Sequence, residues 1–541
     1  MAEDRIGRAS AFLASGTIVS RILGFVKAIV LANAIGLIAS AGADAFTVAN
    51  QLPNTIYVVV AGGVLSAVLV PQIVRAGLHA DGGSAYINRL VTLALVIVGG
   101  ATVVATIAAP LLVRLYGTQL SQATIDLAIL FAYWCLPQIF FYGLYTLLGE
   151  VLNARRSFGP FTWVPVLNNI VAITGLVVFM ALWGADPNGT RAPGDWTFAM
   201  VAVLAGSATL GIALQAVVLF WFWRRIGLRY RPDFHWRGVG LGDAGRMASW
   251  TFGMLLLTTF AGIVETNVVG LASGQGASVA ALGSAWLIFM LPHSVITVSI
   301  ATAYFTRMSE HASIGDIDRV RADVSSAIRG VSLIIVLAAI VLIACAYPFA
   351  TVFTSGAEFE SSLEFGNVIM AYMVGLIPFS FLFIVQRAFY ALGDTKTPFF
   401  FTLFQVAVFS VGALLLINVI PEWIAMGIAL LTSLACFAQT VLATFLLRRR
   451  LGEIDGWRIT SSFVRYAIGA VPALIVGFVL LVALGGLTET GFAMSGIAAA
   501  ITTMIVIGTA MSVVYFGILW MIRTPELRGF AEPLVRRLRR D

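Results

Sequence analysis

Charged residues are scarce in this chain. Only 11% of its 541 residues are Asp, Glu, Lys or Arg, and 60% are hydrophobic. Average soluble proteins carry about 25% charged residues. This shortage excludes a soluble globular protein and predicts an all-α integral membrane protein, because helices satisfy their own backbone polar groups in lipid.

Cysteine, lysine and catalytic motifs are also rare or absent. Cys135, Cys345 and Cys436 lie in apolar runs without a CxxC pair, so no disulfide framework or metal site is expected. Lysine occurs only as Lys27 and Lys396, and the other 31 cations are arginine. Neither GxxxxGK[ST] nor HExxH occurs. We therefore expect neither an enzyme nor a bound cofactor, which leaves sodium or proton coupling or the membrane potential to drive any transport.

Apolar runs of about 20 residues, the length that crosses a bilayer, occur fourteen times. The first run keeps cations and lacks a signal-peptidase pattern, so we expect it to be retained as a span. The expected spans are 9–36, 46–73, 88–113, 122–152, 160–184, 197–223, 247–272, 278–306, 328–354, 363–391, 398–419, 422–447, 460–486 and 491–522.

The arginines predict how the spans are oriented. They gather in loops on the side of the N-terminus, whereas the opposite loops hold only Arg114 and Arg191. Because cytoplasmic loops carry the excess of Lys and Arg, we expect both termini in the cytoplasm. This bias also accounts for the net charge of +7 without a nucleic-acid partner. The basic tail fits either a solvated anchor or a helix lying on anionic lipid.

A weak internal repeat predicts two lobes. Leu52-Pro53 recurs as Leu291-Pro292 at an offset of 239, and a turn before Pro160-Phe161 recurs before Pro398-Phe399 at an offset of 238. An offset of six spans implies two six-helix lobes in parallel, with a substrate site between them. The expected parts are lobes 1–223 and 247–447, a cytoplasmic basic linker 224–246, a C-terminal helix pair 448–522 and a basic tail 523–541.

Two cations interrupt the first span. Arg21 and Lys27 each cost roughly 2.5–3.5 kcal/mol at mid-membrane, so such residues usually face a cavity. Arg21 is too deep to reach the surface, whereas Lys27 could also snorkel. Gly16, Ser20 and Gly24 form a stripe beside Lys27 that suits close helix packing. We assign Arg21, Lys27 and Ser20 to substrate binding and Gly24 to a hinge.

The second span carries a polar stripe. Thr47, Asn50, Asn54 and Tyr57 recur at helical spacing, and Pro53 should act as a hinge. We assign Asn50, Asn54 and Tyr57 to substrate binding, with hydrogen bonding between helices as the alternative for the asparagines.

Two further candidate contacts lie at the outer end of the second span and within the span 278–306. Asp44 is a candidate substrate contact, with a helix cap or a solvated charge as alternatives. His293 is a second candidate contact beside an expected hinge at Pro292. A lone histidine in an apolar span often has a hydrogen-bonded structural role instead.

Glu265 is the one carboxylate deep within a predicted span. A buried carboxylate binds an ion, becomes protonated or pairs with a cation. We expect it to bind an ion or to pair with Lys27 or Arg21 in at least one state. Additive effects of Glu265→Gln and Lys27→Met on transport would contradict a pair.

These motifs resemble the MurJ (MviN) family of lipid II flippases in the MATE-like MOP superfamily. The residues that carry the resemblance are Ser20–Phe25, Asp44–Ala49, Leu52–Asn54, Leu69–Pro71 and Gly393–Pro398. The resemblance implies alternating-access transfer of a polyprenyl-pyrophosphate-linked peptidoglycan precursor to the outer leaflet of the bacterial cytoplasmic membrane. It implies membrane lipids and cell-wall synthesis proteins as partners. It also places Arg21 at the pyrophosphate and matches Asp44 to a family acid.

The chain departs from the family pattern at several positions. Lys27 stands where many members have arginine, and Tyr57 and Leu287 replace two cavity arginines. Glu265 resembles an acid that members use for sodium, but Phe409 and Ala413 replace the accompanying asparagines. A flippase for another polyprenyl-linked glycan, a drug/cation antiporter and a non-transporting cell-wall scaffold are therefore alternatives.

Overall fold

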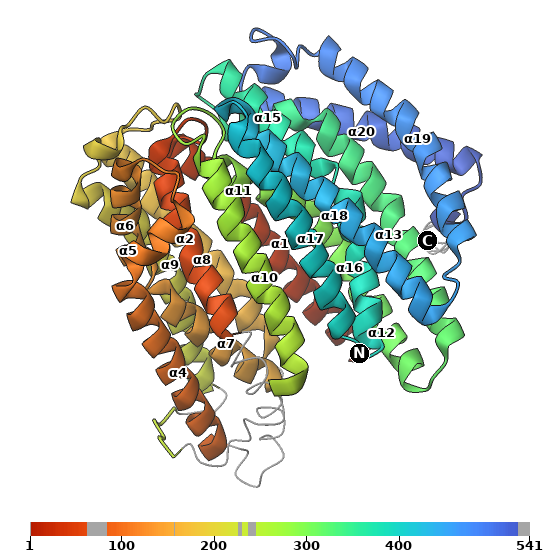
Figure 1. Ribbon diagram of the computed structural model, residues 1–541, viewed down its shortest axis with the longest axis horizontal. Coiled ribbons are helices and arrows are strands. Elements are labelled where there is room, and N and C mark those ends of the chain that lie inside the picture. The colour runs from red at the N-terminus through yellow and green to blue at the C-terminus, as the bar shows by residue number, and fades with distance from the viewer. Residues whose placement is uncertain (1, 62–83, 156, 226–229, 236–244, 529–541) are drawn as a thin grey trace. The chain divides into compact units, whose positions relative to one another are not determined.

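The fold is helical throughout the part of the chain that the structure describes (Figure 1). This computed structural model describes residues 2–61, 84–155, 157–225, 230–235 and 245–528. Thirteen helical segments of these residues are long and apolar enough to cross a membrane. The expected span 46–73 lies partly outside the described residues, which leaves the count one short of fourteen. The all-α integral membrane fold is confirmed.

The chain divides into two compact units, Met1–Gly274 and Gln275–Asp541. Unit 1 holds α1 (Ala2–Ile35), α2 (Ala41–Val60), α4 (Ser84–Ile107), α5 (Ala109–Tyr116), α6 (Gln122–Cys135), α7 (Gln138–Ala154), α8 (Phe158–Trp183), the 3-10 turn η2 (Pro193–Asp195), α9 (Phe198–Arg225) and α10 (Gly245–Gly270). Unit 2 holds α11 (Val279–Pro292), the π-helical turn η3 (His293–Thr297), α12 (Val298–Ser313), α13 (Ile317–Ala344), α14 (Ala346–Phe353), α15 (Phe359–Met373), α16 (Leu376–Ala391), α17 (Lys396–Leu415), the 3-10 turn η4 (Leu416–Asn418), α18 (Pro421–Leu451), α19 (Gly456–Ala483), the 3-10 turn η5 (Phe492–Met494) and α20 (Ile497–Met521).

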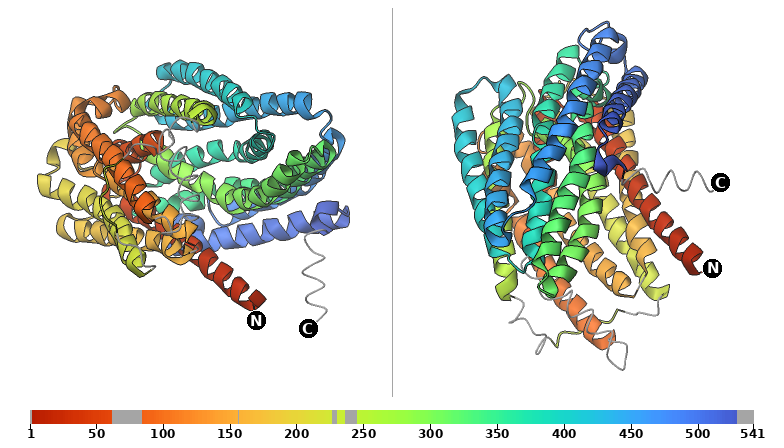
Figure 2. Two further views of the ribbon diagram at one scale, coloured as in Figure 1. Left: turned by 90° about the horizontal axis from the view of Figure 1, so that it is seen from below. Right: turned by 90° about the vertical axis from the view of Figure 1, so that its right-hand side faces the viewer.

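In unit 1, α8 packs against α1 and α9, and α2 packs against α6 and α7. The expected span 247–272 forms α10, which the sequence places in the second lobe. In the structure α10 packs against α2 and α5 of unit 1. The first turns of α1 extend beyond its neighbours in this unit (Figure 2).

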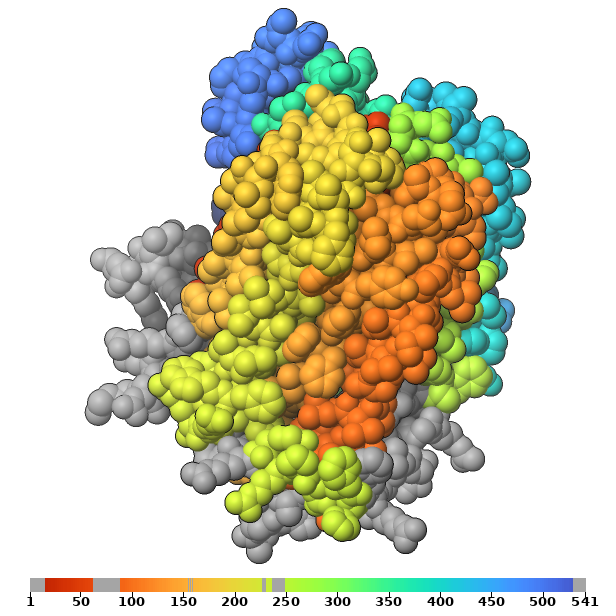
Figure 3. Space-filling view, turned by 90° about the vertical axis from the view of Figure 1, so that its left-hand side faces the viewer, coloured from red at the N-terminus to blue at the C-terminus, as the bar shows by residue number. Residues whose placement is uncertain are grey.

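The outer surface of unit 1 suits a lipid environment. Figure 3 shows a face of this unit built by α4, α6, α7 and α9, in orange to yellow. Exposed side chains of α4 and α9 include Val103, Val104, Leu210 and Val217. Large exposed aliphatic side chains are expected where a helix meets acyl chains.

The internal repeat is visible in where the helices break. The fourth span of the first half breaks between α6 and α7 at Pro137, and its counterpart breaks between α15 and α16 at Gly375, an offset of 238. The short helices α5 and α14 begin at Ala109 and Ala346, an offset of 237. These offsets match those in the sequence, so the parallel two-lobe repeat is confirmed.

The two breaks have different causes. Pro137 lacks the backbone N–H that would continue α6. A Cβ added to Gly375 would lie 2.6 Å from the Oγ of Ser433, so glycine allows α18 to approach the second break. Ser433 Oγ also donates a hydrogen bond to the carbonyl of Ala371, at 2.8 Å.

The C-terminal helix pair is joined to the core of unit 2. α19 packs against α13 and α20, and the buried phenols of Tyr466 and Tyr515 donate hydrogen bonds to the carbonyls of Arg329 and Leu333, at 3.0 and 2.9 Å. Nη1 of Arg329 lies 2.5 Å from Oε1 of Glu526, which also accepts from Ser462. The segment after α20 is therefore held to α13 by a largely buried ion pair.

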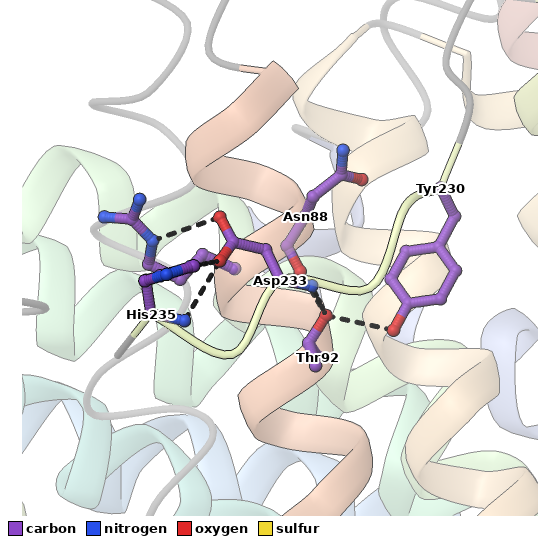
Figure 4. Close-up of polar contacts among 6 residues, drawn as sticks. Asn88, Thr92, Tyr230, Asp233 and His235 are labelled. Atoms are coloured by element: carbon purple, nitrogen blue, oxygen red, sulfur yellow. Dashed lines mark hydrogen bonds and ion pairs between the residues drawn. The ribbon is translucent and has the colours of Figure 1, made fainter. Parts of the chain in front are cut away.

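Part of the expected linker 224–246 is fixed to the start of α4 (Figure 4). The Asp233 amide donates to Thr92 Oγ1 at 3.0 Å, and the same oxygen lies 3.0 Å from the hydroxyl of Tyr230. Nε of Arg89 lies 3.4 Å from Oδ2 of Asp233, and both the amide and the ring of His235 contact Oδ1. Residues 230–235 therefore form an attached segment between α9 and α10.

This attachment should be insensitive to pH between 5 and 8. The hydrogen bonds from the His235 amide and ring, followed by the charge of Arg89, lower the pKa of Asp233. A lowered folded-state pKa gives stabilisation that is present above the unfolded value of about 3.9 and lost as the pH falls through the folded value. We expect constant trypsin cleavage after Arg231 from pH 8 to 5, after correction for the enzyme's own pH profile.

The variant Asp233→Asn should be cleaved faster than the wild-type protein at every pH in this range. His235→Ala is the control, because the His235 side chain is 91% exposed and removing it leaves the Arg89 contact. Cleavage that slows below about pH 6.5 would show instead that protonated histidine holds the segment.

Candidate functional site

The small-residue stripe on α1 separates into a packed part and an open part. A Cβ added to Gly16 would lie 2.8 Å from Nε1 of Trp163 on α8, whereas one added to Gly24 meets nothing within 4 Å. Asn169 of α8 donates a hydrogen bond to the Ser20 carbonyl at 2.9 Å. Gly16 and Ser20 thus serve the packing of α1 on α8, and the hinge at Gly24 remains a prediction. Arg21 is partly buried on the same helix.

Gly16→Ala and Gly24→Ala should therefore change stability in opposite directions. Overpacking against Trp163 should lower the free energy of unfolding by about 1–3 kcal/mol. At the open Gly24 position, alanine should stabilise the helix by about 0.5–1 kcal/mol. Thermal unfolding of the two variants in detergent tests this, and equal shifts of the midpoint would contradict the packing role of Gly16.

One polar face of α2 points into unit 1. Asn50 and Lys27 line the same cavity of about 100 Å³, together with Tyr142 and Asn168. Gln138 donates to Oδ1 of Asn50 at 3.3 Å. The structure thus brings together two predicted substrate contacts, in a space that holds a few waters or one small ion.

Tyr57 lies on the same side of α2 as Asn50. Its hydroxyl donates to Oγ1 of Thr146 on α7 at 2.6 Å, and its ring lies 5.8 Å from that of Tyr142. In this structure Tyr57 connects two helices, and its substrate contact remains a prediction.

A second polar face of α2 points toward α10. It lines a cavity of about 290 Å³ that contains two predicted residues, Asn54 and Glu265. The complete lining is Gln51, Asn54, Thr55, Val58, Tyr116, Leu255, Thr258, Thr259, Gly262, Glu265 and Thr266. A carboxylate among amides and hydroxyls can bind a cation or a polar headgroup.

Sequence reasoning missed Gln51 and Thr55 in this cavity. Their spacing with Asn54 and Val58 is i, i+3, i+4 and i+7, which places all four on one helix face. Nε2 of Gln51 is buried without a hydrogen-bond partner among the described residues. Glu265 and Lys27 line different cavities here, and their pairing in another state remains a prediction.

Asp44 lies in the first turn of α2 and is 1% exposed. The helix cap is Ser40, whose side chain accepts a hydrogen bond from the Ala43 amide at 3.1 Å. Both alternatives for Asp44, a solvated charge and the N-cap, are therefore excluded, and its role as a substrate contact remains a prediction.

In unit 2, Pro292 ends α11 and the π-helical turn η3 follows. A π-helical turn after proline marks an irregular helix, which is consistent with the predicted hinge. His293 is 2% exposed, its Nδ1 lies 3.2 Å from Oγ of Ser380, and its ring meets Phe379 at 4.6 Å. This environment favours the structural alternative for His293. Among the described residues, no group of three or more His, Cys, Asp or Glu side chains could hold a metal ion.

A family comparison decides the class of this membrane protein. The model of the lipid II flippase MurJ family matches residues 31–502. The chain belongs to this family. It is therefore a multi-pass membrane protein of the MurJ family. This result agrees with the resemblance that the motifs of the first two spans carry.

Relatives of this MurJ-family protein extend over most of its length. It is 27% identical over 482 residues to a probable lipid II flippase MurJ of Rhizobium tropici, covering 86% of this chain and 84% of the relative. It is 25% identical over 461 residues to a probable lipid II flippase MurJ of Vibrio cholerae, covering 81% and 82%.

Solved structures share the fold. A lipid II flippase MurJ in an inward closed conformation matches with a TM-score of 0.71 at 19% identity, covering 94% of this chain and 99% of that one. An inward-facing multidrug resistance MATE transporter of the MOP superfamily matches with a TM-score of 0.63 at 15% identity, covering 81% and 95%. The fold of this chain is thus shared with a MurJ structure and with a MATE transporter structure.

Proposed function

We propose that this protein is a lipid II flippase of the bacterial cytoplasmic membrane, with both termini in the cytoplasm. It carries the lipid-linked peptidoglycan precursor from the inner to the outer leaflet by alternating access of two lobes. The observation that carries this proposal is the match of the MurJ family model to residues 31–502.

The intramembrane charges support an anionic substrate. Arg21 and Lys27 both lie on α1, and guanidinium in particular offers a fork of donors to phosphate oxygens. A substrate with two negative charges that leaves an inside-negative cell gains roughly 4.6 kcal/mol per 100 mV. The membrane potential then favours export if these cations return without substrate. In this scheme the chain catalyses no reaction and needs no cofactor, and sodium or proton coupling through Glu265 is a second source of energy.

Depletion of the protein should leave lipid II in the inner leaflet of living cells. The measurement is the fraction of lipid II that an impermeant reagent reaches from outside, before and after depletion. Unchanged exposure of lipid II would contradict the proposal. Accumulation of a different polyprenyl-linked precursor would keep the flippase mechanism and change its substrate. Pull-down of cell-wall synthesis enzymes tests the protein partners that we propose.

A second candidate, a drug/cation antiporter, is favoured by one observation. Glu265 lines a cavity of about 290 Å³ with amides and hydroxyls, a setting that suits an organic or inorganic cation. An antiporter predicts that expression raises resistance to cationic drugs and that Glu265→Gln removes this resistance. A flippase predicts unchanged resistance.

A further inference from the structure

Unit 2 carries an arginine inside a membrane-spanning helix that the proposed mechanism does not use. Arg387 lies on α16, four residues before the helix ends at Ala391, or about 6 Å along its axis. Its side chain is partly exposed. A charged residue within a spanning helix is costly and usually faces the bundle interior or a water-filled cavity.

The guanidinium of Arg387 has aromatic neighbours but no anionic one. Its Cζ lies 4.8 Å from the ring centre of Phe383 on the same helix and 5.5 Å from that of Phe305 on α12. No described residue forms an ion pair or hydrogen bond with it. Two rings therefore orient the group while its N–H donors remain available.

Other arginines of unit 2 show that this arrangement is not general. Arg307 lies 2.7 Å from the buried carboxylate of Asp323, and Arg329 pairs with Glu526. In these pairs a carboxylate offsets the charge within the protein. At Arg387 no described carboxylate offsets the charge, so the guanidinium can accept an anion from a ligand.

The surface beside Arg387 is polar. The exposed positions of α12 include Ser299, Thr302 and Thr306, whereas those of α17 are apolar, as at Val411 and Leu414. A helix face of hydroxyl groups indicates contact with water, and a face of aliphatic side chains indicates lipid. Arg387 therefore lies beside a helix that has polar residues at several of its exposed positions.

Two neighbouring side chains add hydrogen-bonding capacity. Gln386 donates to the Tyr390 hydroxyl oxygen at 3.0 Å, which leaves the hydroxyl proton of Tyr390 free to donate elsewhere. Tyr390 is three residues after Arg387, so the two side chains project from neighbouring positions of α16. A guanidinium fork and a neighbouring phenol that can donate together suit a phosphate group.

We propose that Arg387 binds the diphosphate of the lipid-linked glycan on unit 2. This inference rests on the proposed function and deepens it, because it adds a cation on unit 2 to Arg21 and Lys27 of unit 1. Two phosphates need about two positive charges nearby. With Arg387 the chain has a phosphate contact on each of its two units.

The test measures binding of a water-soluble, short-chain lipid II analogue to the full-length protein in phosphatidylcholine nanodiscs. Arg387→Met should raise Kd roughly tenfold or more, since charge-assisted hydrogen bonds are lost. Arg387→Lys should give a smaller increase, because it keeps the charge and loses the fork. Arg449→Met is the matched control: Arg449 lies 4.4 Å above the Phe445 ring, four residues earlier on α18, and is exposed.

Each result of this binding measurement either supports or overturns a stated proposal. Equal Kd for wild type and Arg387→Met, or equal losses in Arg387→Met and Arg449→Met, overturns the inference and leaves the proposed function intact. If phosphatidylglycerol in the nanodisc abolishes the difference between wild type and Arg387→Met, the site belongs to bulk phospholipid and the inference is overturned. A wild-type protein that does not bind the analogue overturns the proposed function itself.

A folding defect would not obscure the answer. If Arg387→Met is not monodisperse by size exclusion, Arg387→Lys and Phe305→Leu replace it, the latter keeping the cation and removing one flanking ring. A raised Kd in both supports the inference, and an unchanged Kd in both overturns it.

Discussion

Replacing Lys27 with methionine is expected to stabilise the folded protein and to reduce its transport rate at least tenfold. Lys27 lines a cavity of about 100 Å³ and has no ion pair or hydrogen bond with any described residue. A partly buried ammonium without a carboxylate partner is destabilising, so a hydrophobic side chain of similar volume should add about 1–4 kcal/mol to the free energy of unfolding. Transport should fall because the substrate loses a cation that its diphosphate would meet.

The thermal midpoint in detergent and lipid II exposure in cells give the two readouts. Lys396→Met is the control, because Lys396 is exposed at the start of α17 and is the only other lysine. A lower midpoint for Lys27→Met would mean that the ammonium has a structural partner in the native protein. Normal transport with a raised midpoint would remove Lys27 from the substrate path.

Glu526→Gln is expected to lower the free energy of unfolding by about 3–5 kcal/mol. Its partner Arg329 is 19% exposed and Glu526 is 7% exposed, so removing the carboxylate leaves a largely buried guanidinium without its anion. The change also weakens the contact of the segment after α20 with α13 and with Ser462 of α19, which donates to the same carboxylate oxygen. Thermal unfolding in detergent measures the effect.

Two further variants separate the effect of the lost charge on stability from the effect of lost packing. The double variant Arg329→Met with Glu526→Leu should recover most of the lost stability, because neither buried charge remains. Asp318→Asn, in an exposed pair with Arg321, should change stability by less than about 1 kcal/mol. A double variant as unstable as Glu526→Gln would show that packing, rather than charge, sets the loss.

Much of the fold could be predicted from the sequence because hydropathy is a local property. The spans and the repeat both follow from runs of apolar residues and from recurring Leu-Pro pairs. The assignment of α10 to unit 1 could not be predicted in this way, since it depends on contacts with α2 and α5 that are remote in sequence. The breaks at Pro137 and Gly375 were also missed, the second because it depends on the approach of Ser433.

The candidate site was predicted less completely. The polar stripe of α2 was treated as one face, but Asn50 and Asn54 line different cavities. The hydrophobic periodicity of a helix shows which of its positions are polar. It does not show which neighbouring helix each polar side chain contacts. Arg387 was overlooked because a cation near the end of a span resembles a positive-inside anchor, and the sequence does not show that Phe305 and Phe383 flank it in a partly buried position.

The partly buried position of Lys27 in a small cavity gives this protein an intrinsic reporter of its own motion. An amine-reactive reagent can modify only Lys27, Lys396 and the chain's terminal amine. Lys396 is exposed at the start of α17, so it reacts continuously and provides an internal reference. The rate at which Lys27 becomes modified, relative to Lys396, therefore measures how accessible its cavity is to solvent. Peptide mass spectrometry can read that frequency with and without substrate in the unmodified wild-type sequence.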